Sequence, residues 1–191
     1  SPAGLYLGGL SGLVAPVAIV GGLASLALFL AHGATFLSFK TGSPLAGRAR
    51  TTAMVMSPVA GLLVVGTAAW LSAGGSHGPG YLPAAVPIAL AAGCGLAFVI
   101  AAMLVWAHWE TAAFGLSALG IVAAVGSIFT LLYPRVMVSS GPGPSLTIWN
   151  AASADKTLIV MTVVAAIFVP VVLAYQGWSY WVFRQRLVRP A

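Results

Sequence analysis

Residues 157–183 read TLIVMTVVAAIFVPVVLAYQGWSYWVF, an uncharged run that is followed at once by an arginine. A helix needs about 20 consecutive apolar residues to cross a bilayer, and this run is long enough. Helix ends at a membrane surface commonly carry aromatic and basic side chains. The expected interface anchors of this helix are Trp178, Tyr180, Trp181, Arg184 and Arg186.

The composition of the whole chain also predicts a membrane protein. Of its 191 residues, 60% are hydrophobic and 5% are charged, whereas a soluble domain carries about 25% charged residues. The net charge of +6 arises outside the apolar runs, so it indicates membrane orientation and not nucleic-acid binding. Cys94 is the only cysteine, which excludes an internal disulfide and a thiolate metal site.

Five apolar stretches are long enough to span the membrane. They lie at about residues 13–39, 51–73, 83–107, 111–133 and 157–183. We therefore predict an all-α integral membrane protein in which residues 1–191 form a single transmembrane domain with five transmembrane helices. None of the five stretches contains an Asp or Glu, which disfavours a self-contained proton-coupled transporter.

The distribution of Lys and Arg predicts the orientation. Lys40, Arg48 and Arg50 fall in the first loop and further arginines follow the last span, whereas Arg135 and Lys156 fall on the other side. The side richer in Lys and Arg is usually cytoplasmic. We therefore expect the N-terminus outside and the C-terminus in the cytoplasm. An outside N-terminus without a signal-peptide pattern also leads us to expect further helices ahead of this chain.

His32 is the ionisable side chain that lies well inside a predicted span. A charge at this depth is costly, so we expect a neutral, hydrogen-bonded histidine. Contact with a quinone, proton relay and haem ligation are the functional alternatives. A second haem ligand at matching depth is hard to find, because His108 lies at the membrane edge and His77 in an external loop. The sequence predicts no catalytic residue and no metal ligand.

Polar residues in two connections are further candidates. Glu110 precedes the fourth span, where its charge favours the N-terminus of a helix; a proton entry point is the alternative. Asn150, Asp155 and Lys156 precede the last span and are candidate contacts with a partner subunit. Ser153 or Asp155 also has the chemistry to cap that helix.

Several stretches resemble subunit II of the cytochrome bd quinol oxidase family. Residues 21–50, GGLASLALFLAHGATFLSFKTGSPLAGRAR, are similar to a middle helix of that subunit and its basic turn. Residues 131–140, LLYPRVMVSS, then SLTIWNAAS and the last span, are similar to its C-terminal part. The resemblance implies that this chain supplies the fourth helix of an eight-helix subunit, with its own last four helices forming a four-helix bundle.

The same resemblance implies a function in aerobic respiration. The family oxidises membrane quinol and reduces oxygen to water, with haem b, haem d and quinone on or near the haem-bearing subunit I. This chain would be a non-catalytic subunit of that terminal quinol oxidase, holding no cofactor and bracing subunit I. Its expected surroundings are membrane lipid and quinone in a bacterial or archaeal plasma membrane. The resemblance leaves open a small accessory subunit.

Two other functions fit the residues alone. A small cytochrome b-like electron carrier would hold haem through His32, and the poor match in depth with His108 counts against it. A passive multi-helix permease or assembly factor is compatible with spans that contain no carboxylate. No motif in the chain supports this second alternative directly.

Overall fold

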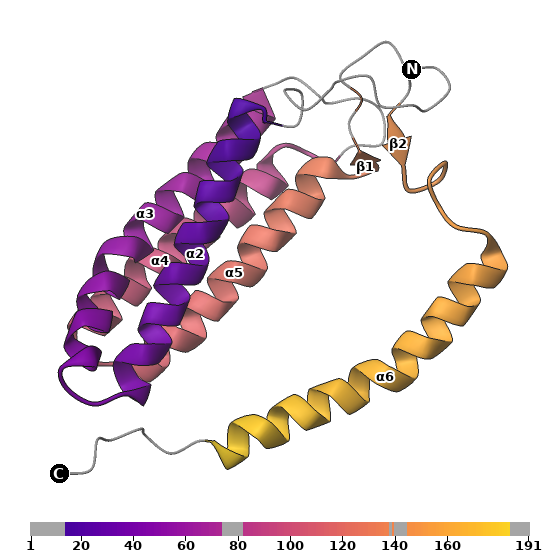
Figure 1. The fold of residues 1–191 in the computed structure, drawn as a ribbon. Helices are drawn as coiled ribbons and strands as arrows, with labels where there is room; N and C mark the ends of the chain where they lie inside the picture. Colours follow the sequence, from indigo (N-terminus) through magenta and orange to yellow (C-terminus); the bar gives the residue numbers. More distant parts are fainter. Residues whose placement is uncertain (1–13, 74–81, 138, 140–144, 184–191) are drawn as a thin grey trace.

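The computed structural model describes residues 14–73, 82–137, 139 and 145–183. Long helices make up most of this part of the chain (Figure 1): α2 Pro16–Lys40, α3 Leu45–Ala73, α4 Ala85–Trp106, α5 Glu110–Leu132 and α6 Asp155–Val182. All five are long and apolar enough to span a membrane. The predicted all-α membrane fold with five spanning helices is therefore confirmed.

The helix boundaries have local causes. Pro16 occupies the first turn of α2, where its fixed φ and missing N–H are tolerated. α3 begins at Leu45, earlier than the predicted start at residue 51, so Arg48 and Arg50 belong to its first turns. Hydropathy identifies only the part of a helix that lies in the lipid. The predicted start was late because α3 extends beyond that part into the basic turn.

Four helices, α2 to α5, pack into an antiparallel bundle (Figure 1). α2 packs along α3, α3 along α4 and α4 along α5, while α2 and α5 meet along a less extensive seam. The core positions carry mostly small side chains, which let helix backbones approach closely in a membrane. Fully buried alanines occur in each of the four helices: Ala31, Ala53, Ala60, Ala101 and Ala113, with Ala91 and Ala124 nearly so.

α6 lies apart from this bundle (Figure 1), and none of its residues is buried. This corrects the expected grouping of the last four helices, because the bundle contains α2 and leaves out α6. The short turn after Lys40 makes α3 pack directly against α2. The connection between α5 and α6 is long, so α6 need not pack against α5. At its far end α6 returns to α2, since Lys40 Nζ donates to the Phe183 carbonyl oxygen at 3.3 Å.

The connection from α5 to α6 contains a small antiparallel ribbon. Its strands are β1 Arg135–Met137 and β2 Leu146–Thr147, with Arg135 opposite Thr147 and Met137 opposite Leu146. The all-α prediction included no strand here. The ribbon and the start of α6 lie at the opposite end of the molecule from the turn between α2 and α3 (Figure 1).

Candidate functional site

The first candidate site is His32, in the C-terminal half of α2. Its Nδ1 lies 2.7 Å from Ser117 Oγ on α5, which confirms the expected hydrogen bond. Ser117 Oγ also donates to the Phe114 carbonyl oxygen at 2.9 Å. Because a hydroxyl has one proton, Ser117 accepts from His32, and a neutral ring therefore carries its proton on Nδ1. Nε2 is then the remaining acceptor of the ring.

Aromatic rings surround this histidine along the α2–α5 seam. The His32 ring stacks on Phe114 with centroids 4.4 Å apart, and Phe36 and Phe39 lie 5.6 and 5.7 Å from the same phenylalanine ring. All four rings are half-buried. We call these four residues and Ser117 the His32 cluster. It presents ring surface together with one hydrogen-bond acceptor, a combination that suits an apolar molecule with a polar head.

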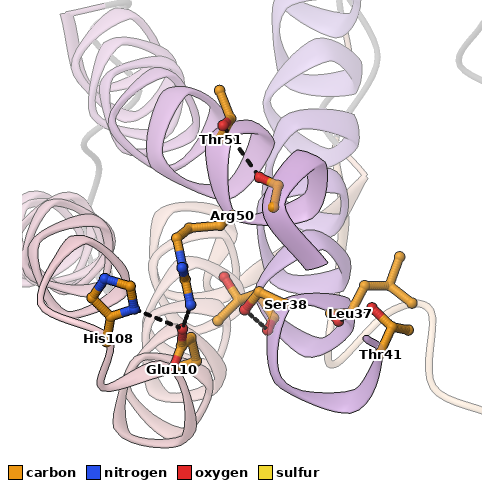
Figure 2. A network of polar contacts seen from close by, with 9 residues as sticks. Leu37, Ser38, Thr41, Arg50, Thr51, His108 and Glu110 are labelled. Atoms are coloured by element: carbon orange, nitrogen blue, oxygen red, sulfur yellow. Dashed lines mark hydrogen bonds and ion pairs between the residues drawn. The ribbon is translucent and has the colours of Figure 1, made fainter. Parts of the chain in front are cut away.

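The second candidate site lies at the end of the bundle that carries Lys40, Arg48 and Arg50, which we call the basic end. Figure 2 shows Arg50 from α3 and His108 from the α4–α5 turn, both directed toward Glu110. Arg50 Nη2 donates to Glu110 Oε1 in an ion pair, and His108 Nδ1 lies 4.0 Å from the same oxygen. The Glu110 side chain is 10% exposed and that of Arg50 is 29% exposed, so the pair is largely buried.

The turn between α4 and α5 positions Glu110. His108 has a φ of 64°, and its N–H donates to Val105 O at 3.1 Å while Trp109 N–H donates to Leu104 O at 2.8 Å. These two bonds form a Schellman motif with His108 at the position that usually holds glycine. α5 can then begin at Glu110 immediately after the turn.

Sequence reasoning assigned Glu110 to the helix dipole and missed its partner. The residue is in the first turn of α5, as that role requires, but its main contact is the guanidinium of another helix. The available signal was the predicted topology, which puts Arg50 and Glu110 on the same side of the membrane. In a chain with two acidic residues and a net charge of +6, a buried carboxylate needs a basic neighbour.

The candidate contacts with a partner subunit lie in the α5–α6 connection and at the start of α6. Asn150 shapes the turn after β2: its Oδ1 accepts from Thr147 N–H at 2.6 Å, and its Nδ2 donates to Ser145 O at 3.2 Å. Asp155 and Lys156 are exposed on the first turn of α6. The ribbon of this connection and the start of α6 lie at the opposite end of the molecule from the turn between α2 and α3 (Figure 1), whereas His32 lies in the half of α2 nearer that turn.

The expected side-chain cap of α6 is not formed. Ala154 occupies the N-cap position and makes no side-chain hydrogen bond. Asp155 follows it in the first turn, where it complements the helix dipole, and Ser153 lies outside the helix.

The predicted membrane anchors are partly described. Trp178, Tyr180 and Trp181 are exposed on the last turns of α6, and Trp178 contacts Tyr175 with ring centroids 6.3 Å apart. Arg184 and Arg186 lie outside the described residues, as does His77. Within the described part of the chain, no three His, Cys, Asp or Glu residues are grouped to hold a metal ion.

Comparison with known proteins gives consistent results. Residues 2–183 match the family described as cytochrome bd terminal oxidase subunit II. Cytochrome bd ubiquinol oxidase subunit 2 of Bacillus subtilis is 36% identical over 175 aligned positions, covering 88% of this chain. A probable cytochrome oxidase subunit 2 of Haemophilus influenzae is 31% identical over 92% of the chain. Cytochrome bd-I ubiquinol oxidase subunit 2 of Escherichia coli K12 is 27% identical over 96% of it.

The lengths of these relatives differ from that of this chain. The alignments cover 50%, 53% and 56% of the three relatives, so the chain spans about half the length of the curated proteins it matches.

Proposed function

The chain belongs to the cytochrome bd terminal oxidase subunit II family, and we propose that it acts as the C-terminal part of a haem-free, non-catalytic subunit. In this role it braces a haem-bearing partner while the complex oxidises quinol and reduces oxygen to water. The relatives are named as subunits of ubiquinol oxidases, which supports the reaction class. Haem b, haem d and the reacting quinone are proposed to reside on or near subunit I.

The observation that carries the bracing role is the exposure of α6. It has the highest mean hydropathy of the five helices, 2.7, and none of its spanning segment is buried. Helices in a membrane associate through close packing and polar contacts, and the bundle of α2 to α5 already satisfies its own core. α6 is therefore the element available for packing against subunit I.

Five spanning helices and the family place the chain in a bacterial membrane as a multi-pass protein. We propose that the basic end faces the cytoplasm, because it carries Lys40, Arg48 and Arg50. Asp155 and Lys156 then lie on the outer face at the start of α6, where they are exposed for contact with subunit I. Asn150 is proposed to contribute by holding the shape of the preceding turn.

Spectroscopy of the purified chain tests the proposed function. The tagged protein, extracted from its native membrane in mild detergent, is expected to travel with a large membrane subunit and to show haem b and haem d in a reduced-minus-oxidised visible spectrum. A haem b signal that stays on this chain after the partner is removed would favour the electron carrier instead. Purification with neither haem nor partner would favour the permease or assembly factor.

The His32 cluster is proposed to hold a quinone inside the membrane, as the quinol whose hydroxyl can donate to His32 Nε2, or to make another polar contact there. His32→Ala removes the bond to Ser117 and the stacking on Phe114. A membrane hydrogen bond contributes about 0.6 kcal/mol on average, so we expect a modest loss of complex yield together with a lower quinone content. Quinone extracted per haem from the purified complex, and the yield of that complex, are the measurements.

A matched substitution on the same helix separates this effect from general damage. Ser25→Ala removes an exposed hydroxyl that bonds to Gly21 O of its own helix, and it should leave yield and quinone content unchanged. Unchanged assembly, quinone content and turnover in His32→Ala would remove His32 from the functional residues.

A further inference from the structure

The buried polar side chains of the bundle gather in the half nearer the basic end. The other half contains Ser127, whose hydroxyl donates to the Pro87 carbonyl oxygen at 2.8 Å. Phe98 is fully buried between the two halves, and a Cβ on Gly120 would lie 2.8 Å from its ring. The polar set in the basic half is Thr35, Ser38, Ser57, Glu110 and Ser117.

Contacts between neighbouring helices give the depth of Ser57. They join Gly21 to Thr67, Gly61 to Gly95, Gly120 to Phe98 and His32 to Ser117. Adjacent helices are antiparallel, so residues can be counted along each pair of helices from these contacts. This count puts Ser57 at about the same height along the bundle axis as Phe98 and Ser117. Ser57 therefore lies at the inner limit of the polar half, where the Phe98 ring begins.

Ser57 differs from the other buried hydroxyls of this half. Thr35 donates to Ala31 O at 2.8 Å and Ser117 to Phe114 O, the usual bonds of helical Ser and Thr to their own backbone. The Ser57 residue is 1% exposed, and its Oγ has no hydrogen-bond partner among the described residues. The hydroxyl therefore makes none of the usual bonds to the carbonyls of α3.

The backbone next to Ser57 also lacks one of its usual helical donors. Pro58 lies inside α3 and has no N–H, so the Met54 carbonyl oxygen loses its usual helical donor. Arg50 Nε, about two turns before Ser57 and on the same face of α3, is likewise buried without a partner among the described residues. Two buried side-chain atoms on one face of α3 thus have no partner among the described residues, and the Met54 carbonyl oxygen beside them lacks its i+4 donor.

We propose that this face of α3 is hydrated from the basic end, with an internal water molecule bound by Ser57 Oγ and the Met54 carbonyl oxygen as its innermost member. An unpaired buried polar group is costly, and buried waters typically satisfy such groups with about three hydrogen bonds each. The buried residues near Ser57 are small, as at Ala31 on α2 and at Ala53 one turn earlier on α3, and the Phe98 ring ends the hydrated line.

This site is independent of the bracing role and of the His32 cluster as a quinone contact. Its ligand class is water that exchanges with the solution at the basic end. The line of waters brings exchangeable protons from that solution to the height of Ser117 in the bundle. Ser117 is the hydrogen-bond partner of His32 Nδ1.

Thiol reactivity in the intact complex tests the hydrated line. Ser57→Cys places a thiol at its inner end, and the natural Cys94, fully buried, serves as the reference in the same chain. With silver ion as a small hydrophilic probe, followed by denaturation, alkylation and peptide mass spectrometry, we expect position 57 to react at least about tenfold faster than Cys94. Equal protection of both thiols would overturn the proposal.

A high-resolution map of the unsubstituted complex tests the water directly and does not depend on the folding of a variant. An ordered water is expected at about 2.8 Å from Ser57 Oγ and within reach of the Met54 carbonyl oxygen. A Ser57 hydroxyl bonded directly to a protein carbonyl would overturn the inference.

Discussion

Arg50→Met is expected to lower the free energy of unfolding of the bundle by about 2 kcal/mol. The substitution leaves the Glu110 carboxylate, 10% exposed, without its guanidinium partner. Breaking a fully buried pair costs about 3–5 kcal/mol, and the partial exposure of Arg50 reduces that figure through solvent screening. Thermal unfolding of the purified complex should show a midpoint lower by about 5 °C.

The two partners should not be equivalent. Glu110→Gln leaves an arginine that is 29% exposed and has a long, flexible stem, so its charge can turn toward water. We expect a smaller loss than for Arg50→Met. Replacing both residues by apolar ones, Arg50→Met with Glu110→Leu, should recover most of the stability, because no unpaired charge is then buried.

Arg48→Met is the matched control for these variants. Arg48 lies in the same first turns of α3 but is exposed, so its loss removes an equal charge without breaking the buried pair. Its unfolding midpoint should stay close to that of the unsubstituted protein. If Arg48→Met were as damaging as Arg50→Met, the effect would come from net charge and not from the pair with Glu110.

The five helices were predictable because lipid selects long apolar runs, and these runs are separated by charged or Gly/Pro-rich turns. The choice of bundle partners was harder to predict, because these helices are apolar on all sides and no polar face marks the exterior. A usable signal does exist. The buried faces of α2 to α5 consist mainly of Ala, Ser and Gly, whereas residues 157–173 of α6 are mostly large and branched.

The candidate sites were predictable in kind but not in detail. A histidine deep in a span must find a hydrogen bond, and His32 does. Its partner Ser117 depends on the rotation and depth of two helices far apart in sequence, which local patterns do not set. The pairing of Arg50 with Glu110 depends further on the Schellman turn at His108, where a residue other than glycine adopts a positive φ.

Gly61→Ala is expected to destabilise the bundle by about 2 kcal/mol, a typical cost of overpacking a close helix contact. A Cβ built on Gly61 would lie 3.0 Å from Gly95 Cα and 3.1 Å from Gly95 O. Both are backbone atoms, so α3 and α4 would have to move apart. Thermal unfolding of the purified complex is the measurement.

Gly66→Ala provides the control within the same helix. A Cβ on Gly66 meets nothing within 4 Å, and alanine favours a helix over glycine by about 1 kcal/mol. This variant should therefore match or exceed the stability of the unsubstituted protein. Equal loss in both variants would show that α3 resists any added methyl group, and would contradict a specific contact at Gly61.

Gly95→Ala should fall between these two substitutions. Its Cβ would meet Val65 Cγ2 at 3.0 Å, and the closest backbone atom, Gly61 O, is 3.5 Å away. A side-chain methyl can yield by a small rotation, although the branched valine has few rotamers. The order of stability loss, Gly61→Ala above Gly95→Ala above Gly66→Ala, follows from which atom each new methyl meets. It therefore tests the α3–α4 contact atom by atom.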